Sequence, residues 1–424
     1  MGSTLRANDA SAPFKVLVVG GSYCGLAAAF NLSDLCLGKA ARAASSYEGQ
    51  DALPKENQPI HAEITLVDER DGFYHVIGSP LVFADRPYAE KAWIPYSEIP
   101  SLQAATNIKT IHGSVTSVDM AGKTAVVKET ALAGGATRTL DFDFIIVAAG
   151  LRRAFPVVPQ SGDRAAYLAE VGPHIESVMT AQDGVLVVGG GAVGIEMAAE
   201  LKLAQPHVKV TLAHSRPRLL SSEPLPDFLA EKTLEILKEN GVEVLLEHRL
   251  QETRELGDGA KEVVFTNGHT LRANAVVVAI SQSKPSTDFL PAKAVNEEGY
   301  VKIQPNLFFP TDVPNYDSAL AAGDGVQWSG IKRCGRAMHQ GYFAAHNCHQ
   351  RMQELAFGTP AKFQLLKEII PMIAIALGPN AIGYADGGEL QHGKDVAKRF
   401  FDDDVGLKIC ENILGFGKKT EAKV

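Results

Sequence analysis

Short runs of consecutive apolar residues alternate along this chain with longer segments of helical periodicity. The run 14–19 (FKVLVV) passes through a glycine-rich turn into a helical segment of small residues that ends near Leu37. The run 184–188 (GVLVV) leads into a similar turn and a similar helix. Short apolar runs with such boundaries predict strands buried on both faces. Because these strands alternate with helices, the pattern predicts an α/β fold with parallel sheets.

The recurrence of this pattern divides the chain into parts. Strand and helix signals alternate from residue 184 to residue 281, and apolar segments around a Pro-Asn turn predict a hairpin that two short amphipathic helices follow. A stretch rich in Ala, Ser, Gly and Pro between Gly38 and Pro59 indicates a surface insertion. The predicted parts are a flexible tail (1–12), the first part of one domain (13–155), a second domain (156–285), the second part of the first domain (286–360) and a small α+β region (361–424).

Both apolar runs end in a turn that resembles the dinucleotide-binding pattern G-x-G-x-x-G. Its first glycine makes the bend, the second lets the pyrophosphate approach the backbone, and the third allows close helix–strand packing at an anion-binding helix start. The first turn contains Gly20, Gly21, Ser22 and Gly25, and the second contains Gly189, Gly191 and Gly194. A serine is small and can donate to a phosphate, so we predict that Ser22 is tolerated. An ordinary strand–helix turn is the alternative for either turn alone, but two such turns predict two Rossmann-like domains.

The residue at the end of the following strand recognises the ribose in such domains, about 20 residues after the turn. Asp68 ends the strand AEITLVD once the insertion is removed, and an acid there favours a free 2′-hydroxyl, as in FAD or NAD. His214 holds the equivalent position after the second turn, and Arg216 and Arg218 follow it. Two cations without an acid can attract a 2′-phosphate. The second turn therefore permits NADPH as well as NADH.

A third element completes the predicted cofactor site. The sequence LAAGDGV places Gly323 and Asp324 after an apolar strand and before a helix, where a carboxylate can accept hydrogen bonds from a sugar-alcohol chain. A plain turn residue is the alternative for Asp324. Gly150, at the end of the apolar strand DFDFIIVAAG, belongs to the same predicted site.

Composition and charge narrow the function. The 424 residues carry a net charge of −8, which argues against a nucleic-acid surface. Five widely spaced cysteines without a C-x-x-C pair argue against a disulfide scaffold, a metal site and a redox-active disulfide, and favour buried thiols of a reducing compartment. We expect no transmembrane helix, and Arg6 stands where an N-myristoylation signal requires Ser or Thr.

Together these motifs resemble the two-dinucleotide flavoproteins with a glutathione-reductase-like fold. The segments LVDERDGFYH, VVGGGAVGIEMAAELK, VTLAHS and ALAAGDGV are more narrowly similar to the apoptosis-inducing-factor-like branch that includes ferroptosis suppressor protein 1, with type II NADH dehydrogenases as relatives. The resemblance implies FAD at the first turn, NAD(P)H at the second, the flavin ribityl chain at Asp324, and hydride transfer from nicotinamide to flavin. Without a cysteine pair, we expect electrons to leave for an external acceptor, which in this branch is usually a quinone.

The resemblance also implies roles for individual residues. Glu196 matches a glutamate that lies near nicotinamide and flavin in relatives, although a glutamate complementing the helix dipole is nearly as good an interpretation. Met338, His339 and Gln340 lie at the start of a helix directed at the flavin, and are candidates for flavin or acceptor contacts. His339 as a proton donor to a quinone is a minority hypothesis, because a lone histidine is usually structural.

Two questions stay open from the sequence. The amphipathic C-terminal helices could contact a membrane peripherally on the cytoplasmic side, but docking on the protein's own surface is favoured because consecutive aspartates suit an anionic membrane poorly. The main alternatives to a quinone reductase are a flavin oxidoreductase specific for one small metabolite and a redox-gated signalling or cell-death flavoprotein. A monomer and a homodimer are both compatible with the sequence.

Overall fold

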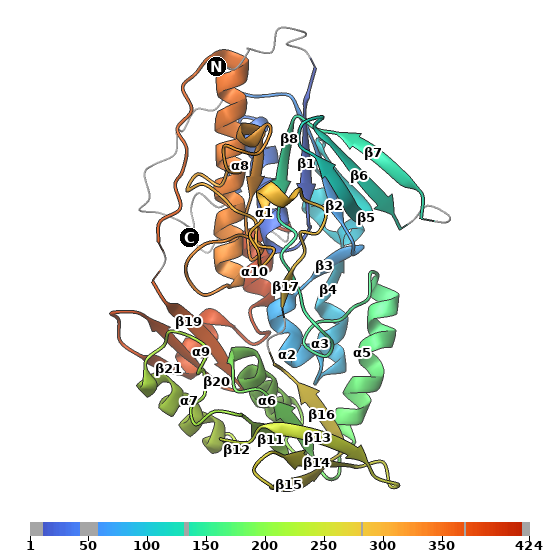
Figure 1. Ribbon diagram of the computed structural model, residues 1–424, viewed down its shortest axis with the longest axis vertical. Helices are drawn as coiled ribbons and strands as arrows, with labels where there is room; N and C mark the ends of the chain where they lie inside the picture. Colours follow the sequence, from blue (N-terminus) through green and yellow to red (C-terminus); the bar gives the residue numbers. More distant parts are fainter. Residues whose placement is uncertain (1–11, 43–57, 131–134, 281–282, 369, 418–424) are drawn as a thin grey trace.

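The computed structural model describes residues 12–42, 58–130, 135–280, 283–368 and 370–417. Except for residue 12, the predicted flexible tail lies outside the described residues, as does most of the insertion predicted between Gly38 and Pro59. Figure 1 shows an upper body built around a long helix, α8, and a lower body that contains α6 and α7.

A seven-stranded sheet forms the centre of the upper body, in the order β18-β8-β1-β2-β5-β6-β7. Strands β18, β8, β1, β2 and the first half of β5 are parallel, whereas β6 and β7 add antiparallel at one edge. The bounds are β1 Phe14–Val19, β2 Ala62–Asp68, β5 Ile108–Asp119, β6 Thr124–Glu129, β7 Thr137–Asp141, β8 Phe144–Val147 and β18 Ala319–Ala321. Because β1 is the middle one of the five parallel strands, the first glycine turn begins in the middle of their carboxyl edge.

Two helices, α1 (Tyr23–Cys36) and α8 (Cys334–Phe357), pack against each other beside this sheet (Figure 1). Small residues allow their close approach, since a Cβ atom added at Gly341 of α8 would lie 2.3 Å from the carbonyl oxygen of Cys24. The presence of α8 confirms the helix predicted to follow Asp324. It lies beside α1, the helix that the first glycine turn starts.

The lower body contains a four-stranded parallel sheet in the order β12-β11-β10-β16. An antiparallel sheet, β13-β14-β15, covers one of its faces with Val263 and Phe265. The bounds are β10 Val185–Val188, α6 Ala192–Ala204, β11 Val210–Ala213, α7 Asp227–Glu239, β12 Val242–Leu245, β13 Leu250–Glu255, β14 Lys261–Phe265, β15 Thr270–Ala273 and β16 Ala275–Val278. A glycine turn follows an inner parallel strand in each of the two large sheets, and the predicted α/β fold class is confirmed.

Short elements join the two bodies. Two antiparallel strands lie where the chain crosses between the bodies, β9 (Leu151–Arg152) and β17 (Lys284–Pro285). A layer of small elements adds aromatic side chains to the core of the lower body, with Trp93 stacked on Tyr167 at a centroid distance of 5.0 Å. The bounds in this layer are β3 Gly72–Tyr74, α2 Ser79–Val82, α3 Arg86–Lys91, β4 Trp93–Pro95, α4 Pro100–Gln103 and α5 Arg164–Met179.

The last part of the chain, from residue 372 on, contacts both the lower and the upper body. An antiparallel sheet of β19 (Met372–Leu377), β20 (Asn380–Ala385) and β21 (Gln391–Gly393) contacts α6. Two short helices follow, α9 (Lys394–Phe400) and α10 (Leu407–Leu414), and α10 contacts α1. The predicted hairpin and helices of the C-terminal region are thus confirmed.

Candidate cofactor and active site

A cavity of about 1630 Å³ extends between the two bodies and reaches both glycine turns. Cavities of roughly 300–1,000 Å³ hold drug-sized ligands, so this one has room for more than one such molecule. The predicted site residues that line it are Gly20, Ser22, Asp68, Gly150, Gly189, Gly191, Glu196, His214, Arg216, Asp324 and Met338. The predicted site residues outside its lining are Gly21, Gly25, Gly194, Arg218, Gly323, His339 and Gln340.

The first turn shows why a serine is accepted in place of the middle glycine. Gly20 has a φ of +99°, which disfavours any side chain, and a Cβ atom added at Gly25 would lie 1.7 Å from the carbonyl oxygen of Gly20. These two positions therefore require glycine. Ser22 precedes α1 with a φ of −88°, in extended backbone that any residue adopts. Ser22 lines the cavity at the start of the helix.

The second turn repeats the same geometry with a more open middle position. Gly189 has a φ of +129°, and a Cβ atom added at Gly194 would lie 1.9 Å from its carbonyl oxygen. At Gly191 no atom lies within 4 Å of the place a Cβ atom would take. Since Gly191 lines the cavity, its bare backbone is accessible to a ligand at the N-terminus of α6.

In each body, the residue at the end of the strand that follows the glycine turn accepts a hydrogen bond from the backbone of that turn. The carboxylate of Asp68 accepts a hydrogen bond of 2.5 Å from the N–H of Gly21, and Nδ1 of His214 accepts one of 3.1 Å from the N–H of Gly190. Burial raises the pKa of Asp68 and lowers that of His214, so the histidine is neutral at pH 7. With Nδ1 accepting, the ring proton of His214 lies on Nε2, 3.0 Å from the hydroxyl of Ser221.

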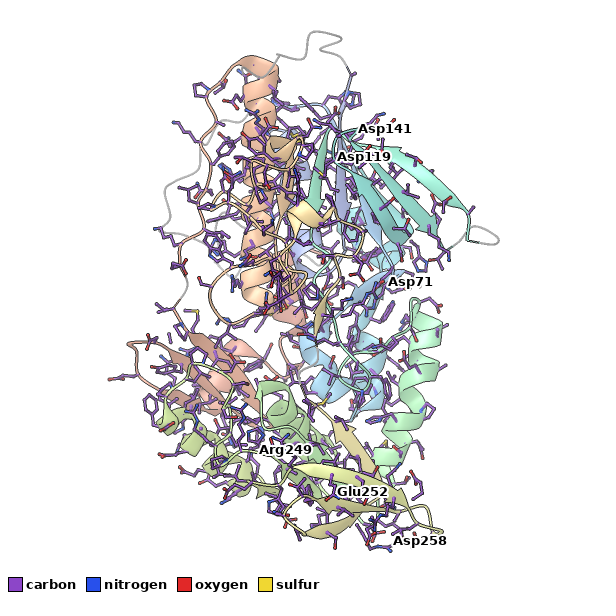
Figure 2. All side chains as sticks on the ribbon, viewed as in Figure 1. Asp71, Asp119, Asp141, Arg249, Glu252 and Asp258 are labelled. Carbon is purple, nitrogen blue, oxygen red and sulfur yellow. The ribbon has the colours of Figure 1, made fainter. Side chains whose placement is uncertain are left out.

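The cationic groups beside His214 differ from the predicted pair. Arg216 is exposed and lines the cavity, whereas Arg218 forms an ion pair with Asp227 and hydrogen-bonds the carbonyl of Leu225. Arg249, which lies just before β13 (Figure 2), also lines the cavity. No acid of the described residues forms an ion pair with Arg216 or Arg249. Sequence spacing could not find Arg249, because it lies on a strand connection far along the chain.

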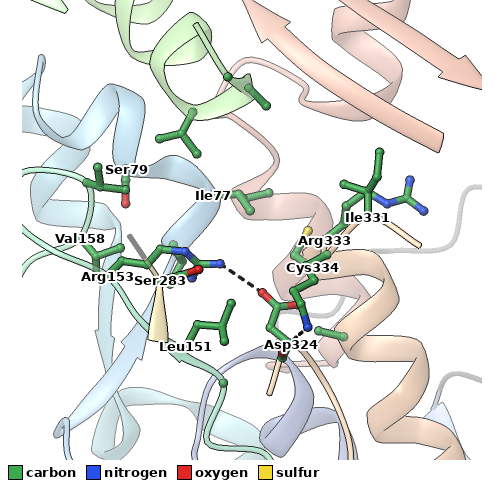
Figure 3. Close-up of a pocket in the computed structure, with 18 of the residues that line it drawn as sticks. Ile77, Ser79, Leu151, Arg153, Val158, Ser283, Asp324, Ile331, Arg333 and Cys334 are labelled. Carbon is green, nitrogen blue, oxygen red and sulfur yellow. Dashed lines mark hydrogen bonds and ion pairs between the residues drawn. The ribbon is translucent and has the colours of Figure 1, made fainter. Parts of the chain in front are cut away.

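Asp324 lies where the upper body meets the crossing segments. Its carboxylate accepts a 3.2 Å hydrogen bond from Nη2 of Arg153 (Figure 3). Lys332 donates a hydrogen bond to its backbone carbonyl. Burial lowers the pKa of Lys332 to about 8. Gln340 is buried and accepts a 2.7 Å hydrogen bond from the N–H of Gly323, so it holds the turn rather than lining the cavity.

Glu196 lines the cavity and also docks the C-terminal hairpin. Its carboxyl accepts a 3.0 Å hydrogen bond from the N–H of Ala376 in β19, and Glu200, one turn further along α6, accepts an equal one from Gly378. Burial raises the pKa of Glu196 to about 8 and that of Glu200 to about 7. Glu196 is therefore mainly protonated at pH 7. Among the described residues no lysine forms an ion pair with it.

The three candidates at the start of α8 separate in the structure. Met338 is buried and lines the cavity, Gln340 supports the Gly323 turn, and His339 lies outside the lining. The ring of His339 packs edge-on against Phe343, with centroids 4.3 Å apart. The structure therefore does not bring His339 together with the other predicted catalytic residue, Glu196.

Two cysteines that are far apart in the sequence line the same cavity. Cys334 begins α8, and Cys410 lies in α10. Both are free thiols. The prediction of buried thiols is confirmed for Cys24, Cys36, Cys348 and Cys410, whereas Cys334 is partly accessible.

The amphipathic C-terminal helices dock mostly on the protein itself. Leu414 and Phe416 are buried in the core of the upper body, and Ile409 and Ile413 line the cavity, whereas Phe400 is 43% exposed. No helix within the described part of the chain is both long and apolar enough to span a bilayer. In the same part, His, Cys, Asp and Glu side chains form no group of three or more that could hold a metal ion.

Comparison with known proteins agrees with this geometry. A family model described as pyridine nucleotide-disulphide oxidoreductase matches residues 14–341. Oxidoreductase OXR1 of Ajellomyces capsulatus is 44% identical, over 98% of this chain and 90% of that protein. Ferroptosis suppressor protein 1 of Mus musculus is 28% identical over 73% of each chain, which confirms the predicted resemblance. An NAD-dependent persulfide reductase from A. fulgidus shares the fold, with a TM-score of 0.65 at 20% identity over 91% of this chain and 65%, less than two thirds, of that one.

Proposed function

The chain belongs to the pyridine nucleotide-disulphide oxidoreductase family, and from this premise we propose that it is an FAD-dependent NAD(P)H dehydrogenase whose electron acceptor is a quinone or a similar small molecule. The observation that carries the proposal is a cavity that reaches both glycine turns and ends on apolar side chains of the C-terminal region. A bound flavin would supply the redox chemistry, which is acceptance of a hydride from a reduced nicotinamide and transfer of two electrons to the acceptor.

The residues of the upper body fit FAD. Ser22 and the N–H groups at the start of α1 would bind the pyrophosphate, and Asp68 would accept hydrogen bonds from the adenosine ribose. Asp324 would accept hydrogen bonds from the ribityl chain. For this to happen Arg153 must share or release its hydrogen bond to the Asp324 carboxylate.

The residues of the lower body fit NADPH better than NADH. Gly191 leaves the backbone open to the pyrophosphate, and neutral His214 replaces the acid that would repel a 2′-phosphate. Arg216 and Arg249 supply two guanidinium groups without acidic partners among the described residues. A guanidinium binds phosphate through paired N–H groups, so these arginines favour the phosphorylated coenzyme.

The acceptor end of the cavity combines apolar side chains with a neutral acid. Met338, Ile409 and Ile413 supply apolar surface, which suits a planar hydrophobic acceptor. Protonated Glu196 can donate a hydrogen bond to a ligand or hold a proton at its carboxyl group, while its other oxygen accepts from Ala376. We propose that the protein is located on the cytoplasmic side, in a reducing compartment.

A second candidate is a flavin oxidoreductase specific for one small anionic metabolite. Around Asp324 the cavity lining includes Arg153, Lys332, Arg333 and Arg336, an excess of cations that a neutral quinone does not need. A carboxylate-bearing substrate would complement them.

Anaerobic stopped-flow absorbance separates these functions. The yellow protein is mixed with NADPH or NADH, and then with a short-chain quinone. Fast bleaching of the flavin band followed by fast reoxidation supports the quinone reductase. Fast bleaching with slow reoxidation by every quinone tried excludes it and favours the specific-metabolite enzyme or a redox-gated signalling protein. Absence of bound flavin contradicts all three.

A further inference from the structure

Leu220 and Ser221 are folded back onto the second glycine turn. The N–H of Leu220 donates a 2.8 Å hydrogen bond to the carbonyl of Gly190. Leu220 is buried and has a φ of +54°, in the left-handed region that a leucine rarely adopts. Strain of this kind persists only where the surrounding structure enforces it, and it is most common at functional sites. The residue that follows this strained leucine, Ser221, lines the cavity and contacts His214.

The directions of the hydrogen bonds in this cluster are fixed by the backbone. The N–H of Gly190 can only donate, so Nδ1 of His214, 3.1 Å away, accepts. The ring is neutral because burial lowers its pKa, and its one proton therefore lies on Nε2. This proton is donated to Oγ of Ser221 at 3.0 Å, which makes Ser221 the acceptor in that contact. The hydroxyl proton of Ser221 must then be directed elsewhere.

The cavity is where this hydroxyl finds a partner. Among the residues that the structure describes, the Ser221 hydroxyl has no hydrogen-bond partner besides His214. Its hydroxyl proton is therefore available to a ligand in the cavity that Ser221 lines. A ligand atom at this place has to be a hydrogen-bond acceptor.

The charges at the same end of the cavity favour an anionic acceptor. Three side chains with donor groups line the cavity here: Arg216, Ser221 and Arg249. The N–H of His248 donates a 2.8 Å hydrogen bond to the carbonyl of His214, which holds the connection before β13 beside the end of β11. One acid, Glu223, also lines the cavity two residues after the serine. The two guanidinium groups leave this end with a net positive charge.

We propose that Ser221 donates its hydroxyl proton to the 2′-phosphate of NADPH, as the last donor of a chain that begins at the N–H of Gly190 and passes through His214. The inference rests on the proposed function, because it assumes that the second glycine turn holds the coenzyme. A phosphate oxygen only accepts hydrogen bonds, and a hydrogen bond to a charged group is stronger than one to a neutral group. Ser221 therefore contributes more to binding of NADPH than to binding of NADH.

Binding of nucleotides that lack the nicotinamide isolates this contact. Isothermal titration calorimetry of the flavin-loaded protein compares 2′,5′-ADP, which carries the 2′-phosphate, with 5′-AMP, which lacks it. The wild type should bind 2′,5′-ADP more tightly. Ser221→Ala should weaken binding of 2′,5′-ADP by about tenfold and that of 5′-AMP by less than about twofold. Because damage to the turn would weaken both nucleotides, the difference between them reports on the phosphate alone.

Three further variants separate the donor from the bulk of the side chain. Ser221→Thr keeps the hydroxyl and should bind both nucleotides as the wild type does. Ser221→Asp keeps an acceptor for His214 but replaces the donor by an anion, so it should lose 2′,5′-ADP and still bind 5′-AMP. Ser222→Ala is the matched control, because Ser222 lines the cavity beside Ser221, and its affinities should be unchanged.

The outcomes distinguish this inference from the proposed function. Unchanged binding of 2′,5′-ADP by Ser221→Ala, or equal weakening of both nucleotides, would overturn the inference and leave the dehydrogenase standing. A wild type that binds the two nucleotides equally would also overturn it, and this result requires no variant. Binding of neither nucleotide to the wild type would contradict the proposed coenzyme site together with the inference.

Discussion

Replacing Glu196 by glutamine tests whether this side chain is neutral while it docks the C-terminal hairpin. Glutamine cannot ionise, but its amide oxygen can accept the same hydrogen bond from the N–H of Ala376. The substitution therefore removes the titration and keeps the contact. The stability of the wild type should depend on pH in a window where that of the variant does not.

The sign and size of the effect follow from the raised pKa. An unfolded glutamate ionises near its ordinary pKa of 4.5, whereas the folded protein keeps the proton up to about 8. Between these values the folded state binds more protons, so stability is lost as pH rises. The full difference of roughly 3.5 units corresponds to about 5 kcal/mol at most. Because Glu196 keeps some solvent access, we expect about 2–3 kcal/mol at pH 8.5.

Thermal unfolding of the flavin-loaded protein, followed from pH 5 to pH 9 at constant ionic strength, measures this difference. Unfolding entropy scales with chain length, so 1 kcal/mol shifts the midpoint of a chain of 424 residues by about 1 °C. Near pH 5 the two proteins should unfold within about 1 °C of each other. At pH 8.5 Glu196→Gln should unfold about 2–3 °C above the wild type.

Glu200→Gln is the matched control, because Glu200 makes the same kind of contact from the same helix. The pKa of Glu200 is raised only to about 7, so its effect should level off at lower pH than that of Glu196. Parallel curves for wild type and Glu196→Gln across the whole range would refute the reasoning. A variant that is less stable than the wild type at high pH would show that Glu196 docks the hairpin as an anion.

Three further predictions concern the cofactor turns. Gly194→Ala should abolish reduction by NADPH yet retain flavin, because its methyl group would lie 1.9 Å from a backbone carbonyl oxygen; stopped-flow reduction at wild-type rate would contradict this. Ser22→Gly should bind flavin as the wild type does, whereas Ser22→Asp should lose it by charge repulsion, as the ratio of flavin to protein absorbance will show. Arg216→Ala and Arg249→Ala should each raise KM for NADPH by about 10- to 100-fold with little change for NADH. Arg218→Ala, whose guanidinium is paired with Asp227, is their control, and an equal effect there would exclude the proposed phosphate site.

Local patterns predicted most of the fold and the glycine turns. The third glycine of each turn is required by contact with the first, which lies only five residues earlier in the chain, so a short sequence motif contains the whole constraint. The fold class could also be predicted from local sequence, since each parallel strand coincides with its own apolar run. The domain boundaries proposed from these runs stay a prediction.

Contacts between segments that are distant in the chain could not be predicted from the sequence. Arg153 meets Asp324 from a segment that crosses between the bodies, and Arg249 joins Arg216 from another strand connection. The helix α10 contacts α1 only because the end of the chain returns to the upper body. No periodicity or spacing encodes such meetings, since they depend on how whole elements pack. The placement of His339 against Phe343 instead of in the cavity has the same origin.

The hydrogen bonds of Gly21 with Asp68 and of Gly190 with His214 show that the two turns use different acceptors for the same contact. Each turn needs a hydrogen-bond acceptor at the end of the neighbouring strand, and either a carboxylate or a neutral imidazole can provide it. The backbone geometry of the glycine turn therefore does not depend on whether the accepting side chain is negatively charged or neutral. The residue that faces the coenzyme's ribose can therefore differ in charge between the two turns, while both turns keep the same backbone geometry.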